Sequence, residues 1–123
     1  MKTLVVGASS NPTRYAYQAI EKLVNKGYPF IALGRSKGEV FGQTIHTEKI
    51  NWSGIDTVTL YIAPTHQEEY YDYIQMLNPR RVIFNPGTEN SAFERLLTTG
   101  RIQVERACTL VLLSTNQYES KKS

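Results

Sequence analysis

The stretch Thr3-Leu4-Val5-Val6-Gly7-Ala8-Ser9-Ser10-Asn11-Pro12-Thr13-Arg14 decides the fold. Its first four residues form a compact run of apolar and β-branched side chains, which predicts a buried strand. The run ends abruptly in glycine, serine, asparagine and proline, which are typical of a loop. From Tyr15 to Val24 the apolar side chains fall on one helical face, and Gly27 provides a helix stop. Strand, loop and helix in this order form the first half of a strand–helix–strand unit.

The rest of the chain repeats this alternation. Further strands are predicted at residues 29–33, 57–63, 81–84 and 102–104. Helical patterns lie between them, and the first of these is opened by a capping-box spacing at Thr65 and Glu68. We therefore expect an α/β fold, with about five parallel strands in a doubly wound sheet between two layers of helices.

Three segments are less regular. Residues 39–54 are polar and weakly patterned, with a short strand expected near 44–46. The apolar run 109–113 fits either a last strand or a buried helical turn, because periodicity does not separate the two. We expect the domain to span residues 1–115 and residues 116–123 to form a frayed C-terminal tail.

Length and composition exclude several classes of protein. A chain of 123 residues accommodates one domain, and it has no apolar run of about 18 residues that would span a membrane. Its single cysteine, Cys108, excludes an internal disulfide framework and a cysteine-based zinc site. The net charge of +3 comes from scattered cations without the basic cluster that nucleic-acid binding needs. We expect a cytoplasmic protein that binds neither membranes nor nucleic acid.

The loops at the carboxyl ends of the strands are the candidate site, because doubly wound sheets bind ligands there. In the first loop, small residues would let the backbone approach an anion, the serines would add donors and Arg14 would pair with phosphate. Neither G-x-G-x-x-G nor a P-loop motif is present, and the same residues also fit a tight turn with a serine cap. The candidates are Gly7, Ala8, Ser9, Ser10, Asn11, Pro12 and Arg14.

The end of the second strand carries cations where NAD-binding domains carry an acid. Its residues are Leu33-Gly34-Arg35-Ser36-Lys37, and the first acidic residue after them is Glu39. A cation here suits a phosphorylated ribose, as in NADP or coenzyme A. A solvated basic turn is the alternative.

These residues together resemble a known family, the stand-alone CoA-binding domain proteins, which are similar to the N-terminal domain of the succinyl-CoA synthetase alpha subunit. The resemblance extends from Lys2 to about Leu113. It is carried by Gly7-Ala8-Ser9, Pro12, Arg14, Gly27-Tyr28, Glu39, Gly42, Ile55-Asp56, Pro64, Gly87, Gly100 and Cys108.

The resemblance implies a Rossmann-like domain that binds coenzyme A or a related nucleotide. The first loop would hold the pyrophosphate, and Gly34, Arg35 and Lys37 the ribose phosphate. The pantetheine side would be lined by Ala63, Pro64, Asn85, Pro86 and Gly87.

No catalytic or metal-binding constellation is evident. His46 and His66 have no carboxylate partner at a recognisable spacing, although His66 faces the proposed cleft. Cys108 fits a small buried apolar residue, or a thiol near the pantetheine end able to form a mixed disulfide with coenzyme A.

The run Tyr70-Tyr71-Asp72-Tyr73 predicts at least one exposed tyrosine and a homo-oligomer contact through this helix. Amphipathic packing of the tyrosines is the alternative.

We therefore expect a small protein that binds coenzyme A or an acyl-CoA and is not an enzyme. Two alternatives remain: an NADP-dependent enzyme or sensor using the same cleft, and an interaction subunit whose nucleotide site is vestigial.

Overall fold

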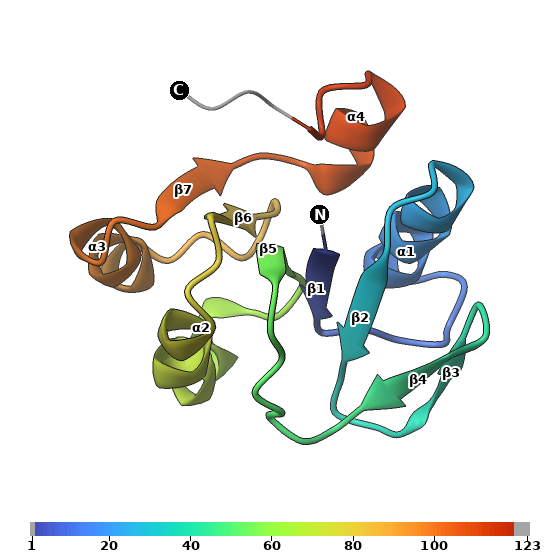
Figure 1. The fold of residues 1–123 in the computed structure, drawn as a ribbon, viewed down its shortest axis with the longest axis horizontal. Helices are drawn as coiled ribbons and strands as arrows, with labels where there is room; N and C mark the ends of the chain where they lie inside the picture. The colour runs from blue at the N-terminus through green and yellow to red at the C-terminus, as the bar shows by residue number, and fades with distance from the viewer. Residues whose placement is uncertain (1, 120–123) are drawn as a thin grey trace.

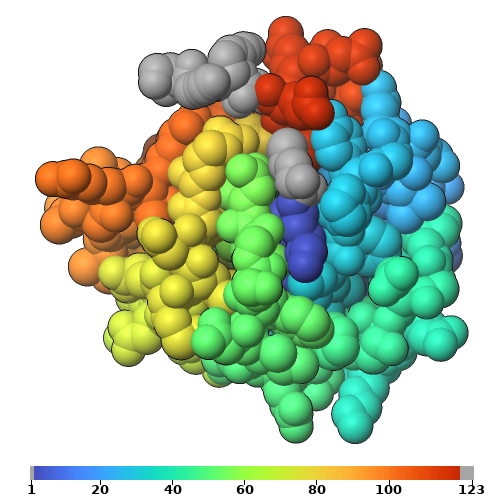
Figure 2. Space-filling view, viewed as in Figure 1, coloured from blue at the N-terminus to red at the C-terminus, as the bar shows by residue number. Residues whose placement is uncertain are grey.

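The first strand, β1 (Lys2–Val6), lies in the middle of the sheet and is covered on both faces. The computed structural model of the chain describes residues 2–119. Leu4, Val5 and Val6 have no exposed surface, as expected for a strand of a parallel sheet between two helical layers. In the space-filling view, the blue start of the chain emerges between the cyan and green segments that flank it (Figure 2).

Seven strands form one sheet in the order β3-β4-β2-β1-β5-β6-β7. All neighbouring strands are parallel except β3, which pairs antiparallel with β4 at one edge. The strands after β1 are β2 (Phe30–Leu33), β3 (Gly38–Val40), β4 (Gln43–His46), β5 (Ile55–Leu60), β6 (Arg81–Phe84) and β7 (Gln103–Arg106). The predicted doubly wound parallel sheet is confirmed, and β3 and β4 extend it beyond the five main strands.

Helices cover both faces of the sheet, so the molecule has three layers (Figure 1). One face carries α1 (Tyr15–Asn25) and α4 (Thr109–Ser114), and the other carries α2 (Tyr71–Leu77) and α3 (Ser91–Thr99). Successive β1 residues point to opposite faces. Leu4 and Val6 therefore join the core under α2 and α3, whereas Val5 joins the core under α1. None of the helices in residues 2–119 is long and apolar enough to cross a membrane.

The prediction that a helix begins at Thr65 is wrong, because the α-helix begins only at Tyr71. Two short 3₁₀ turns, η1 (Pro64–His66) and η2 (Glu68–Tyr70), precede α2, and Thr65 lies inside the first of them. No side chain caps any of these three elements. The reason is Gln67, whose fully buried side chain binds main-chain oxygens of two neighbouring loops and draws the segment into the core.

The tyrosines of this segment point inward, so the expected exposed tyrosine is also wrong. Tyr70 and Tyr73 are buried, and the Tyr73 hydroxyl donates to the main-chain oxygen of Ile50 at 2.5 Å. Tyr71 is partly buried and stacks on Phe93 with ring centroids 4.3 Å apart. These side chains pack within the chain, and they give no support to a homo-oligomer contact through this helix.

The C-terminal segment is part of the fold through Tyr118. The run 109–113 lies in a helix, α4, and the chain then continues onto the amino-terminal edge of the sheet. Tyr118 is buried, and its hydroxyl lies 2.6 Å from Oγ1 of Thr3. The main-chain oxygen of Tyr118 accepts a hydrogen bond from the guanidinium of Arg81. Of the predicted tail 116–123, the part up to 119 is therefore held against the sheet at Tyr118, and residues 120–123 lie outside the described residues.

Candidate functional site

A cavity of about 740 Å³ lies at the carboxyl ends of β1, β2, β5 and β6. The strand order reverses at β1, with β2 on one side and β5 on the other. This is the place where an open parallel sheet leaves a crevice between diverging loops. All four loops that follow these strands contribute to its walls.

The loop after β1 is held against the end of β2 by main-chain contacts. The N–H groups of Gly7 and Ala8 both donate to the main-chain oxygen of Leu33, at 2.8 and 3.0 Å. A Cβ on Gly34 would lie 2.5 Å from the main-chain oxygen of Ala8, so a side chain there would separate the two loops. Gly7 has a φ of +96°, which side-chain-bearing residues rarely adopt.

Asn11 shapes this loop from outside the cavity. Its Oδ1 accepts from the main-chain N–H and the hydroxyl of Thr13, at 3.0 and 2.8 Å. Its own N–H donates to Oγ of Ser9 at 3.0 Å. These hydrogen bonds stabilise the loop that leads from β1 into α1.

The N-terminus of α1 opens into the cavity. Arg14 occupies the N-cap position, and its side chain does not cap the helix. Tyr15 and Ala16, the first residues of the helix, both line the cavity. Uncapped first-turn N–H groups and the helix dipole favour an anion at this point.

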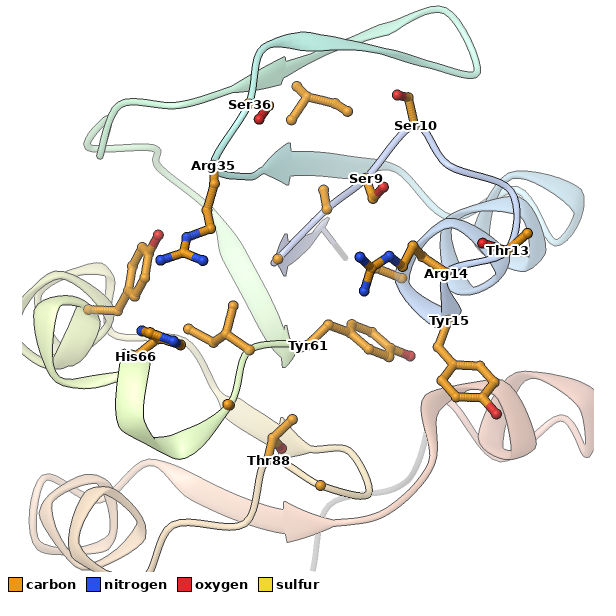
Figure 3. A pocket seen from close by; sticks show the side chains of 18 of the residues that line it. Ser9, Ser10, Thr13, Arg14, Tyr15, Arg35, Ser36, Tyr61, His66 and Thr88 are labelled. Carbon is orange, nitrogen blue, oxygen red and sulfur yellow. The ribbon is translucent and has the colours of Figure 1, made fainter.

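Three cations line the cavity: Arg14, Arg35 and Lys37. Figure 3 shows Arg14 and Arg35 reaching from different loops toward the same space. Within residues 2–119 no carboxylate lies within 4.0 Å of these three groups, whereas Arg80, Arg81 and Arg106 each pair with one. The one carboxylate of the lining, Glu69, lies 3.9 Å from Nζ of Lys49. The cavity lining therefore carries more cations than carboxylates.

In addition to His66 and Glu69, which lie further along the segment after β5, the loops after β5 and β6 contribute an uncharged wall to the cavity. This wall consists of Tyr61, Ile62, Ala63, Pro86, Gly87 and Thr88. Burial raises the pKa of Tyr61, so its phenol is neutral at physiological pH, and within the described part of the chain its hydroxyl has no hydrogen-bond partner. Tyr70 also lines the cavity. Burial raises the pKa of its phenol, and the nearby Glu69 raises it further.

With this geometry established, the comparisons with known proteins bear directly on the site. A family model described as CoA binding domain matches residues 1–114. The chain belongs to the CoA-binding domain family.

Solved structures agree with the fold. One described only as an uncharacterized protein has 51% sequence identity and a TM-score of 0.92, covering 94% of this chain and 95% of that one. A Thermus thermophilus protein has 22% identity and a TM-score of 0.83, covering 94% and 88%. A hypothetical protein from Pyrococcus horikoshii OT3 has 23% identity and a TM-score of 0.82, covering 92% and 81%. A search of curated proteins found no match.

Most of the site residues predicted for this CoA-binding domain lie in the cavity wall. Those that line it are Gly7, Ala8, Ser9, Ser10, Arg14, Arg35, Lys37, Ala63, Pro86 and Gly87. Those that do not are Asn11, Pro12, Gly34, Pro64 and Asn85.

Asn85 has a different role from the one expected. It is 2% exposed, and its Nδ2 donates to Oγ1 of Thr59 and to the main-chain oxygen of Leu60, at 2.7 and 2.8 Å. Its Oδ1 accepts from the N–H of Thr109 at 2.8 Å. Asn85 therefore joins β5 and β6 to the start of α4 below the cavity.

Of the two histidines and the cysteine, only His66 lines the cavity. His46 instead packs edge-on against Trp52 with ring centroids 5.0 Å apart. Cys108 is partly exposed before α4 and does not line the cavity. No cluster of potential metal ligands occurs in residues 2–119.

Several lining residues were missed by the sequence analysis. Thr13 and Ser36 lie between predicted positions, and Tyr15, Ile62 and Thr88 lie directly beside them, so continuous loops extended by one residue would have included all five. Tyr61, Glu69, Tyr70 and Ile45 gave no such signal, because their patterns are those of core or surface residues.

Proposed function

We propose that this protein binds coenzyme A in the cavity, as a carrier or sensor of the intact molecule that performs no reaction on it. The observation that supports this most strongly is the division of the cavity. The loops after β1 and β2 supply three cations and an uncapped helix N-terminus, and the loops after β5 and β6 supply the uncharged wall. Coenzyme A has the same division, with three phosphates at its nucleotide end and an uncharged pantetheine arm.

The residues present fit each part of that ligand. Arg14 and the first turn of α1 would hold the pyrophosphate through charge-assisted hydrogen bonds. Arg35 and Lys37 would hold the ribose phosphate from the loop after β2. The backbones around Ala63 and Gly87 would lie along the pantetheine arm. Serine hydroxyls at positions 9 and 10 add donors on the phosphate side.

NADP is the second candidate, because the loop after β2 carries a cation where an NAD-binding domain carries an acid. The two ligands share a phosphorylated ribose and a pyrophosphate. They differ in the second half, where NADP has a charged nicotinamide ring and a second ribose. The uncharged wall after β5 and β6 favours the pantetheine arm.

A thermal-unfolding panel of coenzyme A, dephospho-CoA, acetyl-CoA, NADP, NAD and ATP tests the proposal. A ligand at about 100 times its Kd stabilises the folded state by about 2.7 kcal/mol. For a domain of this size, that is a rise in Tm of about 8–14 °C. Coenzyme A should give this rise and dephospho-CoA a clearly smaller one. A rise with NADP but with no CoA compound contradicts the proposal, and a panel without any rise indicates a vestigial site.

The arginines give the residue-level test in the same assay and by calorimetry. Arg14→Ala and Arg35→Ala should each weaken coenzyme A binding by about 1.5–3 kcal/mol, since each removes a charge-assisted bond to phosphate. Arg95, exposed on α3 and outside the cavity, is the matched control, and Arg95→Ala should leave the affinity unchanged. Unchanged affinity in both cavity variants would remove the proposed site.

A further inference from the structure

The buried side chain of Gln67 joins the two loops that form the uncharged wall. Its Nε2 donates to the main-chain oxygen of Ile62 at 3.0 Å and to that of Thr88 at 2.8 Å. Ile62 follows β5 and Thr88 follows β6, and both line the cavity. Gln67 itself is fully buried and does not line it. One amide group therefore connects the loops from behind.

The acceptor atom of the same amide is also used, which fixes its orientation. Oε1 of Gln67 accepts from Nδ2 of Asn90 at 3.0 Å. Asn90 is in turn held by its role as the N-cap of α3, because its Oδ1 accepts from the N–H of Phe93 at 3.1 Å. Both donors and the acceptor of Gln67 are thus engaged by groups that have little freedom to move.

A substitute side chain without these hydrogen bonds would release both loops. The oxygens of Ile62 and Thr88 would lose a partner, and a buried carbonyl without one is costly enough to drive a local rearrangement. Gln67 also draws the segment between β5 and α2 into the core, so the same change would loosen the approach to the cavity. The hydrogen bonds of the Gln67 amide do not reach the loops after β1 and β2, which carry Arg14, Arg35 and Lys37, so the change should affect these cations less.

We propose that Gln67 is a positioning residue that sets the spacing of the Ile62 and Thr88 loops and thereby supplies the affinity for the uncharged arm of the ligand. This inference rests on the proposed binding of coenzyme A. It predicts that the nucleotide end and the arm of the ligand respond differently to a change at Gln67.

The experiment compares two probes, coenzyme A and adenosine 3′,5′-bisphosphate, which has the adenosine, the ribose phosphate and one of the two pyrophosphate phosphates but no arm. Calorimetry gives the ratio of the two Kd values for the wild type and for Gln67→Met, which keeps the length and removes the hydrogen bonds. Coenzyme A should bind at least tenfold more weakly to the variant, and the bisphosphate should change by less than twofold. In a Gln67→Met protein whose circular dichroism matches that of the wild type, equal weakening of both probes, or no change in either, overturns the inference.

Gln75→Met is the matched control. Gln75 lies on α2 outside the cavity, and its Nε2 donates to the main-chain oxygen of Tyr71 at 3.1 Å. This variant should leave both affinities unchanged.

A second variant keeps the inference testable if Gln67→Met does not fold. Asn90→Asp retains the helix cap and removes the donor to Gln67, so the preference for coenzyme A over the bisphosphate should fall at least threefold. An unchanged preference in that variant overturns the inference. If the wild type binds neither probe, the proposed function itself fails, which is a different result from wild-type binding with an unaltered preference in the variants.

Discussion

At the scale of single residues, close main-chain approach shapes the part of the cavity formed by the loops after β1 and β2. Gly34 allows the loop after β2 to touch the loop after β1, with its missing Cβ position 2.5 Å from the main-chain oxygen of Ala8 and 3.0 Å from Cγ2 of Ile45. The N–H of Gly34 donates to the main-chain oxygen of His46 at 2.8 Å. This hydrogen bond keeps the backbone at Gly34 from moving away from Ala8. Glycine at this position therefore serves contact between loops rather than contact with a ligand.

Gly34→Ala should lower the free energy of unfolding by about 1–3 kcal/mol, because the added methyl group overpacks a site closed by backbone. Gly100→Ala is the matched control, since a Cβ there would meet only ordinary contacts at 3.6 and 3.7 Å. With a φ of −83°, that position should accept alanine and gain about 0.4–1 kcal/mol. Urea unfolding of the three proteins measures both effects. Equal stability of the two variants would contradict this account of Gly34.

At the scale of elements, the segment after α4 covers the amino-terminal ends of the central strands, opposite the cavity. The ring of Tyr118 packs edge-on against Tyr28 with centroids 5.2 Å apart and lies under the guanidinium of Arg81, 4.7 Å from its centre. Arg81 is fully buried and donates to Oγ1 of Thr57 at 3.0 Å and to Oε1 of Glu105 at 2.9 Å. The last described turn of the chain is thus bound to β1, β5, β6 and β7 through one buried guanidinium and one phenol.

Tyr118→Ala should cost about 3–5 kcal/mol, because it removes a fully buried aromatic ring and leaves Arg81 without its stacking partner. Tyr118→Phe keeps the ring and removes only the bond to Thr3, so it should cost about 1 kcal/mol. The control is Tyr15→Ala on α1, whose side chain is 70% exposed and should cost less than about 0.5 kcal/mol. Denaturant unfolding followed by circular dichroism gives the three values. A small effect of Tyr118→Ala would show that the segment after α4 does not stabilise the fold.

At the scale of the whole molecule, the space around the cavity limits the class of ligand. Both faces of the sheet are filled by packed cores, and the cavity itself has about 740 Å³. It adjoins a surface groove lined by Arg35, Thr65, His66, Glu68 and Glu69, three of which it shares with the cavity. An acyl chain would find an apolar site in neither place, because the two cores are packed and the groove is lined by polar and charged side chains.

We therefore expect the protein to bind the coenzyme with little regard to an attached acyl chain. Coenzyme A, acetyl-CoA, hexanoyl-CoA and octanoyl-CoA should have Kd values within about threefold of one another by calorimetry. A dedicated acyl site would instead gain about 0.8 kcal/mol for each buried methylene group, which is about a fourfold gain in affinity. A steady gain of that size along the series would show that the chain enters an apolar site.

The amino-acid sequence was sufficient to predict the alternation of strands and helices, and with it the end of the sheet that carries the cavity. Local signals were sufficient for this, because a buried apolar run, a glycine-rich loop and a helical face can each be recognised within a few residues. For the same reason, the loop residues Gly7 to Ser10, Arg14, Arg35 and Lys37 could be predicted to line the site, and they do.

Only the tertiary structure decided which polar side chains serve the fold. Asn85 and Gln67 both lie near the ligand-facing loops in sequence, and neither lines the cavity because hydrogen bonds to distant main-chain groups bury them. The tyrosines of α2 and Tyr118 turn inward for a related reason, since the surfaces they cover come from segments more than 20 residues away. Such contacts depend on the order of strands in the sheet, and no local pattern specifies them.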